Sequence, residues 1–147
     1  MSGGSPRFAG VLETVLYHDG GEAREAVERF YGELLGLAAV AGWEDGVAFR
    51  VGAGVLLVFD RGRLTQRSGA IAEHGTSGPG HVCLQAGGGQ YERWREHLQA
   101  GGVEIVHDHH WGGGRSFYFK DPAGNLLEIA DSDIWPQPTC AGGRRRR

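Results

Sequence analysis

The stretch Ser116-Phe-Tyr-Phe-Lys-Asp-Pro-Ala-Gly-Asn-Leu-Leu-Glu-Ile129 has the pattern of a β-hairpin. Aromatic and aliphatic residues dominate its two ends, which favours strands over Ser116 to Phe119 and Leu126 to Ala130. Between them, Asp121-Pro-Ala-Gly124 has proline and glycine at positions that tight turns prefer. Because side chains alternate along a strand, Glu128 is predicted to lie on the face opposite its aliphatic neighbours.

The hairpin closes the second of two similar halves of the chain. Each half opens with an apolar strand and continues with a helix-spaced apolar pattern that ends at Gly36 or Gly101. Glu13 and His81 hold the same place in the two opening strands, which indicates an internal duplication. Besides the hairpin, the predicted strands are Val11 to Tyr17, Leu37 to Ala41, Val47 to Val51, Val55 to Phe59, His81 to Ala86 and Val103 to His107.

The sequence therefore predicts one α+β domain over residues 1–147, built from two β-α-β-β-β modules. Module one is assigned to residues 11–60 and module two to residues 79–131. A polar connection rich in Gly and Ser covers residues 61–78, and a flexible C-terminal tail covers residues 132–147. Each half alone would bury little apolar surface, so the modules are expected to share a core.

Composition and charge limit the classes of function. The chain has 147 residues, 40% of them apolar, with no apolar run of transmembrane length and no signal-peptide pattern after Met1. Without Arg144 to Arg147, 11 basic residues face 18 acidic ones, and the resulting charge of −7 argues against a nucleic-acid partner. Cys83 and Cys140 are too few for a disulfide framework. We therefore expect a cytoplasmic protein without a membrane partner.

Three motifs, in this order, carry a resemblance to known proteins. Phe30-Tyr-Gly-Glu-Leu-Leu-Gly-Leu37 is similar to a helix signature, Gly78-Pro-Gly-His-Val-Cys-Leu84 to the opening strand of a second module, and the hairpin to the closing motif FxDPxGNxxE. Together they resemble the vicinal oxygen chelate superfamily of glyoxalases, bleomycin-resistance proteins and extradiol dioxygenases. The resemblance implies the paired βαβββ fold of these proteins, a small-molecule substrate, a divalent metal ion in a shared trough, and often a homodimer.

The resemblance also implies which residues bind the metal. Ligands in the superfamily come from the first and last strands of a module, which here gives Glu13, His81 and Glu128, whereas Leu57 stands at the fourth position and cannot bind a metal. Carboxylates in apolar strands are costly to desolvate and repel one another, so a cation between them is favoured. Mixed oxygen and nitrogen donors suit Mn²⁺, Fe²⁺, Ni²⁺ or Zn²⁺, and three protein ligands leave positions open for a substrate.

Other interpretations of the three ligands remain open. Glu13 can pair with a cation such as Arg115, His81 can be a pocket histidine held by hydrogen bonds, and Glu128 can lie on an exposed strand edge. Further candidates for catalysis are Tyr118, for which a role in the core or hairpin is an equal alternative, and one of the clustered histidines, of which we take His110. For each histidine, an exposed imidazole at a polar strand end is the favoured alternative. The expected substrate-binding residues are Arg115, Trp111, Cys83 and Ser116, with Cys83 as a lining residue rather than a nucleophile.

The leading hypothesis is a metal-dependent enzyme that holds its substrate through neighbouring oxygens, with glyoxalase-like lyase or isomerase chemistry ranked before oxygen-dependent cleavage. In this hypothesis Glu13 or Glu128 also acts as the base. Leu57 departs from the four-ligand pattern of glyoxalase I, and Glu13 departs from the two histidines of extradiol dioxygenases. The alternative is a metal-free dimeric protein that binds a drug or another small molecule, as bleomycin-resistance proteins do.

Overall fold

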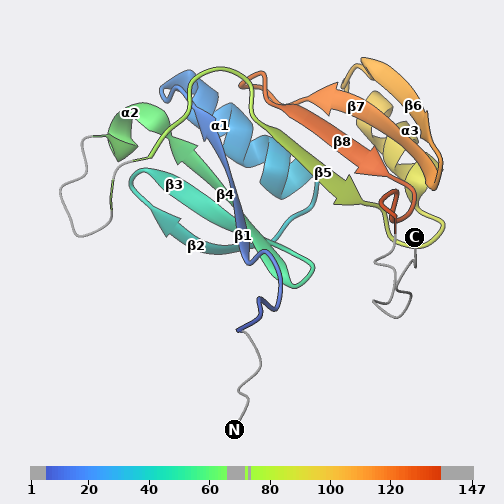
Figure 1. The fold of residues 1–147 in the computed structure, drawn as a ribbon. Helices are drawn as coiled ribbons and strands as arrows, with labels where there is room; N and C mark the ends of the chain where they lie inside the picture. The colour runs from blue at the N-terminus through green and yellow to red at the C-terminus, as the bar shows by residue number, and fades with distance from the viewer. Residues whose placement is uncertain (1–5, 66–71, 73, 137–147) are drawn as a thin grey trace, which may run out of the picture. The chain divides into compact units, whose positions relative to one another are not determined.

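The computed structural model describes residues 6–65, 72 and 74–136. Its strands form two four-stranded sheets, with the strand orders β1-β4-β3-β2 and β5-β8-β7-β6 (Figure 1). In each half, one strand and a helix precede three further strands, which confirms the predicted paired β-α-β-β-β order. The elements are β1 (Glu13–His18), α1 (Glu22–Arg29), η1 (Phe30–Leu34), β2 (Ala39–Trp43), β3 (Gly46–Val51), β4 (Gly54–Asp60), α2 (Arg61–Leu64), β5 (His81–Gln85), α3 (Tyr91–Ala100), β6 (His107–Trp111), β7 (Gly114–Lys120) and β8 (Leu126–Ala130).

The described residues divide into two compact units. The first extends to Val82 and includes Lys120–Leu127, and the second consists of Cys83–Phe119 and the residues from Glu128 onward. The turn of the closing hairpin belongs to the first unit because its side chains bond there. Tyr31 donates a hydrogen bond to Asp121 Oδ2 at 2.7 Å, and Asn125 donates one to the carbonyl oxygen of Tyr17 at 3.0 Å.

Alternation along the strands gives the first sheet two different faces. One face carries the buried side chains of Leu16, Phe49 and Leu56, and the ring of Tyr31 in η1 lies 5.9 Å from that of Phe49. The other face is an apolar cluster that includes residues of β3, β4 and α2. Its buried members are Ala48, Leu57, Phe59 and Leu64, packed with Val15, Tyr17 and Val55.

The second sheet packs one face against α3. Phe117 and Phe119 of β7 are fully buried, and the ring of Phe117 lies 5.2 Å from that of Tyr91 in α3. Leu98 of the same helix is also fully buried. The aromatic residues that predict the hairpin from sequence therefore form the core of this unit, and the alternate residues of β7 point to its other face.

Most strand boundaries differ from the sequence prediction by one or two residues, and the start of β6 differs by four. The first strand begins at Glu13 rather than Val11, because the preceding apolar residues remain exposed. β6 begins at His107 rather than Val103, because its register with β7 is set by a tight turn that places Trp111 opposite Gly114. His109 and His110, which follow the predicted strand, therefore lie within a strand together with His107.

The predicted connection contains a short helix. Asp60 ends β4 and caps α2, accepting a hydrogen bond from the backbone N–H of Arg63 at 3.2 Å. His74 hydrogen-bonds to the hydroxyl of Tyr17, and Arg61 forms an ion pair with Asp19.

Part of the connection, Cys140 and the arginines at 144–147 lie outside the described residues. No helix in the described ranges is long and apolar enough to cross a membrane.

Candidate functional site

Glu128 is a buried carboxylate in the second sheet. It lies in β8 with 4% of its surface exposed, and its Oε1 atom is buried. Tyr118 of β7 and Cys83 of β5 both hydrogen-bond to this carboxylate. β5 and β7 are the two neighbours of β8 in the sheet, so the three side chains meet on one face.

The two partners of Glu128 keep their protons at neutral pH. Desolvation, followed by the hydrogen bond to Glu128, raises the pKa of Tyr118. Desolvation by the surrounding protein raises the pKa of Cys83 to about 12, and the charge of Glu128 and the hydrogen bond to it contribute to this rise. Cys83 is therefore a hydrogen-bond donor and a weak nucleophile, although its side chain is exposed.

A chain of hydrogen bonds leads from the edge of the sheet to Glu128. The indole N–H of Trp111 donates to Ser116 Oγ at 2.9 Å, and Ser116 is fully buried. Desolvation and Glu128 raise the pKa of Tyr118, whereas the hydrogen bond with Ser116 lowers it. The side chains of Trp111, Ser116 and Tyr118 thus form a hydrogen-bonded series that ends at the carboxylate of Glu128.

The register of β6 and β7 decides which histidines share this face. His107 lies opposite Tyr118, and His109 lies opposite Ser116. Directly opposed residues of antiparallel strands point to the same side of the sheet, so both imidazoles lie on the face of the hydrogen-bonded chain. The ring of His109 packs against that of Trp111, with centroids 4.3 Å apart.

Arg115 and His110 are opposite one another on the other face of the hairpin. The guanidinium of Arg115 stacks over Tyr91 of α3 and pairs with Glu92 at 2.9 Å. The structure thus brings Tyr118 and Cys83 directly to Glu128, with Ser116 and Trp111 behind Tyr118. It does not bring Arg115 or His110 to that carboxylate, and the roles of these two residues stay predictions.

His81 begins β5 with its imidazole exposed at the surface. Its Nδ1 lies 2.8 Å from the carbonyl oxygen of Leu126, which can only accept, so Nδ1 carries the proton and Nε2 carries the lone pair. This tautomer is typical of metal-binding histidines, whose second ring nitrogen donates to a carbonyl or a carboxylate. Alternation puts His81 and Cys83 on the same face of β5.

A family model of the Glyoxalase/Bleomycin resistance protein/Dioxygenase superfamily matches residues 23–129. The chain belongs to this superfamily. Among solved members, lactoylglutathione lyase from Agrobacterium tumefaciens is 31% identical, with a TM-score of 0.80 over 88% of this chain and 98% of that one. A glyoxalase-related enzyme from Fulvimarina pelagi is 25% identical, with a TM-score of 0.66 over 88% and 92% of the two chains.

A more distant similarity extends to an oxidase. Oxidase ChaP-H2 is 20% identical, with a TM-score of 0.60 over 93% of this chain and 100% of that one, and this similarity supports the fold alone. A search of curated proteins gave no match. The superfamily match confirms the resemblance carried by the three sequence motifs. Membership alone does not specify the reaction.

The predicted metal ligands of this superfamily member are distributed over both units. Glu13 and His81 belong to the first unit, and Glu128 belongs to the second. Glu13 is exposed at the start of β1, and Leu57, at the fourth ligand position, lies opposite Val15 within the apolar cluster. Within the described part of the chain, no three His, Cys, Asp or Glu side chains form a ready metal cluster. The donor types nevertheless fit a divalent ion, because carboxylates are combined with a histidine in the ligating tautomer.

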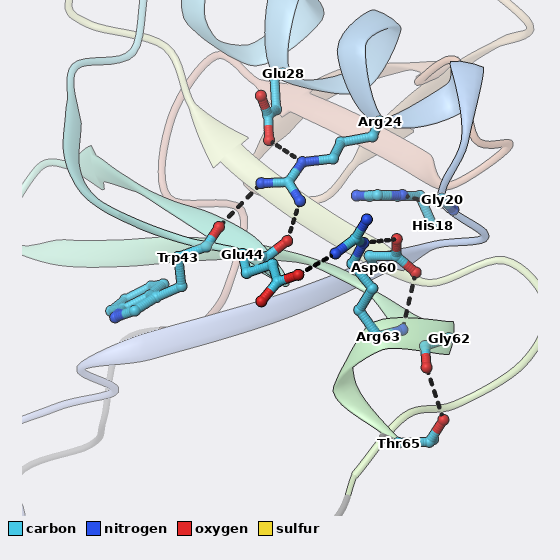
Figure 2. A network of polar contacts seen from close by, with 10 residues as sticks. All are labelled: His18, Gly20, Arg24, Glu28, Trp43, Glu44, Asp60, Gly62, Arg63 and Thr65. Atoms are coloured by element: carbon cyan, nitrogen blue, oxygen red, sulfur yellow. Dashed lines mark hydrogen bonds and ion pairs between the residues drawn. The ribbon is translucent and has the colours of Figure 1, made fainter. Parts of the chain in front are cut away.

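The first unit contains a second polar network, which sequence analysis did not single out (Figure 2). His18 is 2% exposed, and its Nδ1 accepts a hydrogen bond from the backbone N–H of Gly20 at 3.0 Å. Burial lowers the pKa of His18, which keeps the ring neutral. Arg24 donates to the carbonyl oxygens of Trp43 and Glu44. Arg24 thus joins α1 to the β2–β3 turn, and His18 holds the backbone just after β1, so the network has a structural role.

Proposed function

We propose that the protein is a divalent-metal-dependent enzyme that acts on a small substrate with neighbouring oxygen atoms, by lyase or isomerase chemistry of the glyoxalase type. The main support for this proposal is the burial of the Glu128 carboxylate beside Tyr118 and Cys83. A carboxylate buried in a sheet is costly, and two protonated donors directed at it are typical of a functional site. The 31% identity to a lactoylglutathione lyase favours this chemistry over oxygen-dependent cleavage.

In this proposal Glu13, His81 and Glu128 hold the metal ion. When bound, the ion supplies Lewis-acid stabilisation of negative charge on substrate oxygens. Tyr118 holds the carboxylate of Glu128 in place, and Ser116 orients the phenol for this task. Glu13 or Glu128 accepts the proton that the substrate loses, since a carboxylate within reach of a substrate carbon can act as a general base.

Elemental analysis of protein purified without chelator tests the metal requirement. We expect about one divalent ion per chain in the wild type, and its loss in Glu128→Gln, which removes the charge but keeps the size of the side chain. Glu104→Gln is the matched control, because Glu104 is an exposed carboxylate elsewhere in the second unit. A folded wild-type protein without metal would contradict the proposal.

A metal-free binding protein is the second candidate. It is favoured by the exposed indole of Trp43, which stacks on Phe59 with ring centroids 6.2 Å apart, and by the acidic charge of the chain without its terminal arginines. Such a protein would bind an aromatic or cationic compound with the same affinity whether or not a divalent ion is present. Calorimetric titration of such compounds with and without chelator separates the two candidates.

We also propose that the chain forms a homodimer, as the resemblance implies. One chain has a mass of 15.8 kDa. Light scattering coupled to size exclusion should therefore give about twice that mass, whereas a single-chain mass at micromolar concentration would contradict the dimer.

A further inference from the structure

Two histidines lie side by side on the outermost strand of the second sheet. β6 ends the strand order of that sheet, and all five of its residues are exposed. His107 and His109 are two positions apart and lie opposite Tyr118 and Ser116, so both imidazoles point to the same side. Their ring centroids are 5.9 Å apart, and the rings are tilted by 37°.

Neighbouring groups hold the two imidazoles in this arrangement. The ring of His107 lies 5.8 Å from that of Tyr118, and the ring of His109 lies 4.3 Å from that of Trp111. On the opposite side of the strand, Asp108 forms an ion pair with Arg95 of α3. A one-residue slip would turn the histidines to the other face and break these contacts, so the contacts favour the observed register.

We propose that His107 and His109 form a binding site for a late first-row divalent cation such as Cu²⁺, Ni²⁺ or Zn²⁺. Imidazole nitrogens are preferred ligands of these ions, and two of them on one strand face can chelate a single ion. Both side chains are exposed, so water completes the coordination and little desolvation is required. The site is separate from the proposed ligands Glu13, His81 and Glu128 and does not depend on them.

Titration with Cu²⁺, followed by tryptophan fluorescence, tests this site. Bound Cu²⁺ quenches a neighbouring indole, and Trp111 packs directly against His109. The double variant His107→Gln/His109→Gln removes both imidazoles from exposed positions. His110→Gln is the matched control, because it removes an imidazole from the same strand but from the opposite face. Each titration is repeated in a Glu128→Gln background, which separates this site from the proposed catalytic metal.

We expect the double variant to bind Cu²⁺ at least about tenfold more weakly than the wild type, and His110→Gln to bind as the wild type does. The quenching amplitude should fall in Trp111→Phe, and all results should persist in the Glu128→Gln background. Unchanged affinity in the double variant, an equal loss in His110→Gln, or quenching that does not involve Trp111 would each overturn the proposal. Loss of the effect only in the Glu128→Gln background would assign the ion to the other site and also overturn it.

Discussion

The two sheets share a strand order but differ in the chemistry of one face. In the first sheet Val15 lies opposite Leu57, within an apolar cluster. In the second sheet the matching strands, β5 and β8, carry Cys83 and Glu128, joined by a hydrogen bond. The same arrangement of strands therefore closes by apolar packing in one unit and holds a buried charge in the other. A buried carboxyl group is costly without polar neighbours, and in the second unit Tyr118 and Cys83 lie beside it.

The third residues of β3 and β7 show the same difference. Ala48 is 3% exposed and packs in the apolar cluster, whereas Ser116 is fully buried and links Trp111 to Tyr118. The two residues differ by one hydroxyl group: Ala48 only packs, whereas Ser116 orients the functional side chain of Tyr118. The two sheets thus share a strand order, and the buried carboxyl group with its hydrogen-bonded neighbours lies in the second.

The largest loss of stability is expected when a carboxylate is introduced into the apolar face of the first sheet. Leu57→Glu buries a carboxylate without donors, and we expect a loss of about 3–5 kcal/mol in unfolding free energy at neutral pH. The loss should shrink as the pH falls and the carboxylate is protonated. Urea unfolding at several pH values measures it. Leu57→Met should cost less than about 1.5 kcal/mol, and an equal cost for both variants would contradict the comparison.

An intermediate effect is expected from Ser116→Ala, which makes the second sheet resemble the first. The substitution leaves the indole N–H of Trp111 and the phenol of Tyr118 without their shared partner. We expect a loss of about 1–3 kcal/mol in unfolding free energy, together with weaker metal binding. Ser132→Ala is the control, because its hydroxyl lies outside the chain that leads to Glu128. Unchanged stability and metal affinity in Ser116→Ala would argue against an orienting role.

The buried histidine of the first unit, His18, should make the stability of the folded protein moderately dependent on pH. Burial lowers the pKa of His18 below its ordinary value of 6.5, so the unfolded chain binds this proton more readily than the folded one. The contribution of His18 to stability is therefore complete above that value and is lost as the pH falls through the lowered pKa. Unfolding midpoints measured from pH 7 downward should decline less steeply in His18→Gln. Identical slopes would exclude the linkage.

The smallest effect is expected in the reactivity of Cys83. Its pKa of about 12 predicts very slow alkylation by iodoacetamide near neutral pH, despite the exposed side chain. Removing the neighbouring charge with Glu128→Gln should lower this pKa and increase the rate in chelator-treated protein. The measurement uses a Cys140→Ser background, so that Cys83 is the only thiol that can be alkylated. A fast rate in the parent protein would show that the thiolate forms readily and that Glu128 does not suppress it.

The fold was predictable from sequence, and so was the strand face on which Glu128 lies, because strand alternation and the closing hairpin depend on local patterns. The role of Glu128 as a metal ligand stays a prediction. Tyr118 and Ser116 followed from the same alternation. The choice among the clustered histidines was not accessible, because β6 begins at His107 rather than Val103 and its pairing with β7 decides which side chains face Tyr118. The indole bond to Ser116 and the burial of His18 depend on tertiary packing, which no local pattern encodes.

The most direct test of the account is a crystal structure of the protein with Mn²⁺ or Ni²⁺, with anomalous scattering used to locate the ion. We predict a peak at about 2.0–2.2 Å from a carboxylate oxygen of Glu13, Nε2 of His81 and a carboxylate oxygen of Glu128, with coordination positions left for water. A well-ordered crystal with no peak at Glu128, whether or not the ion is found elsewhere, would contradict the assignment of this carboxylate to a metal.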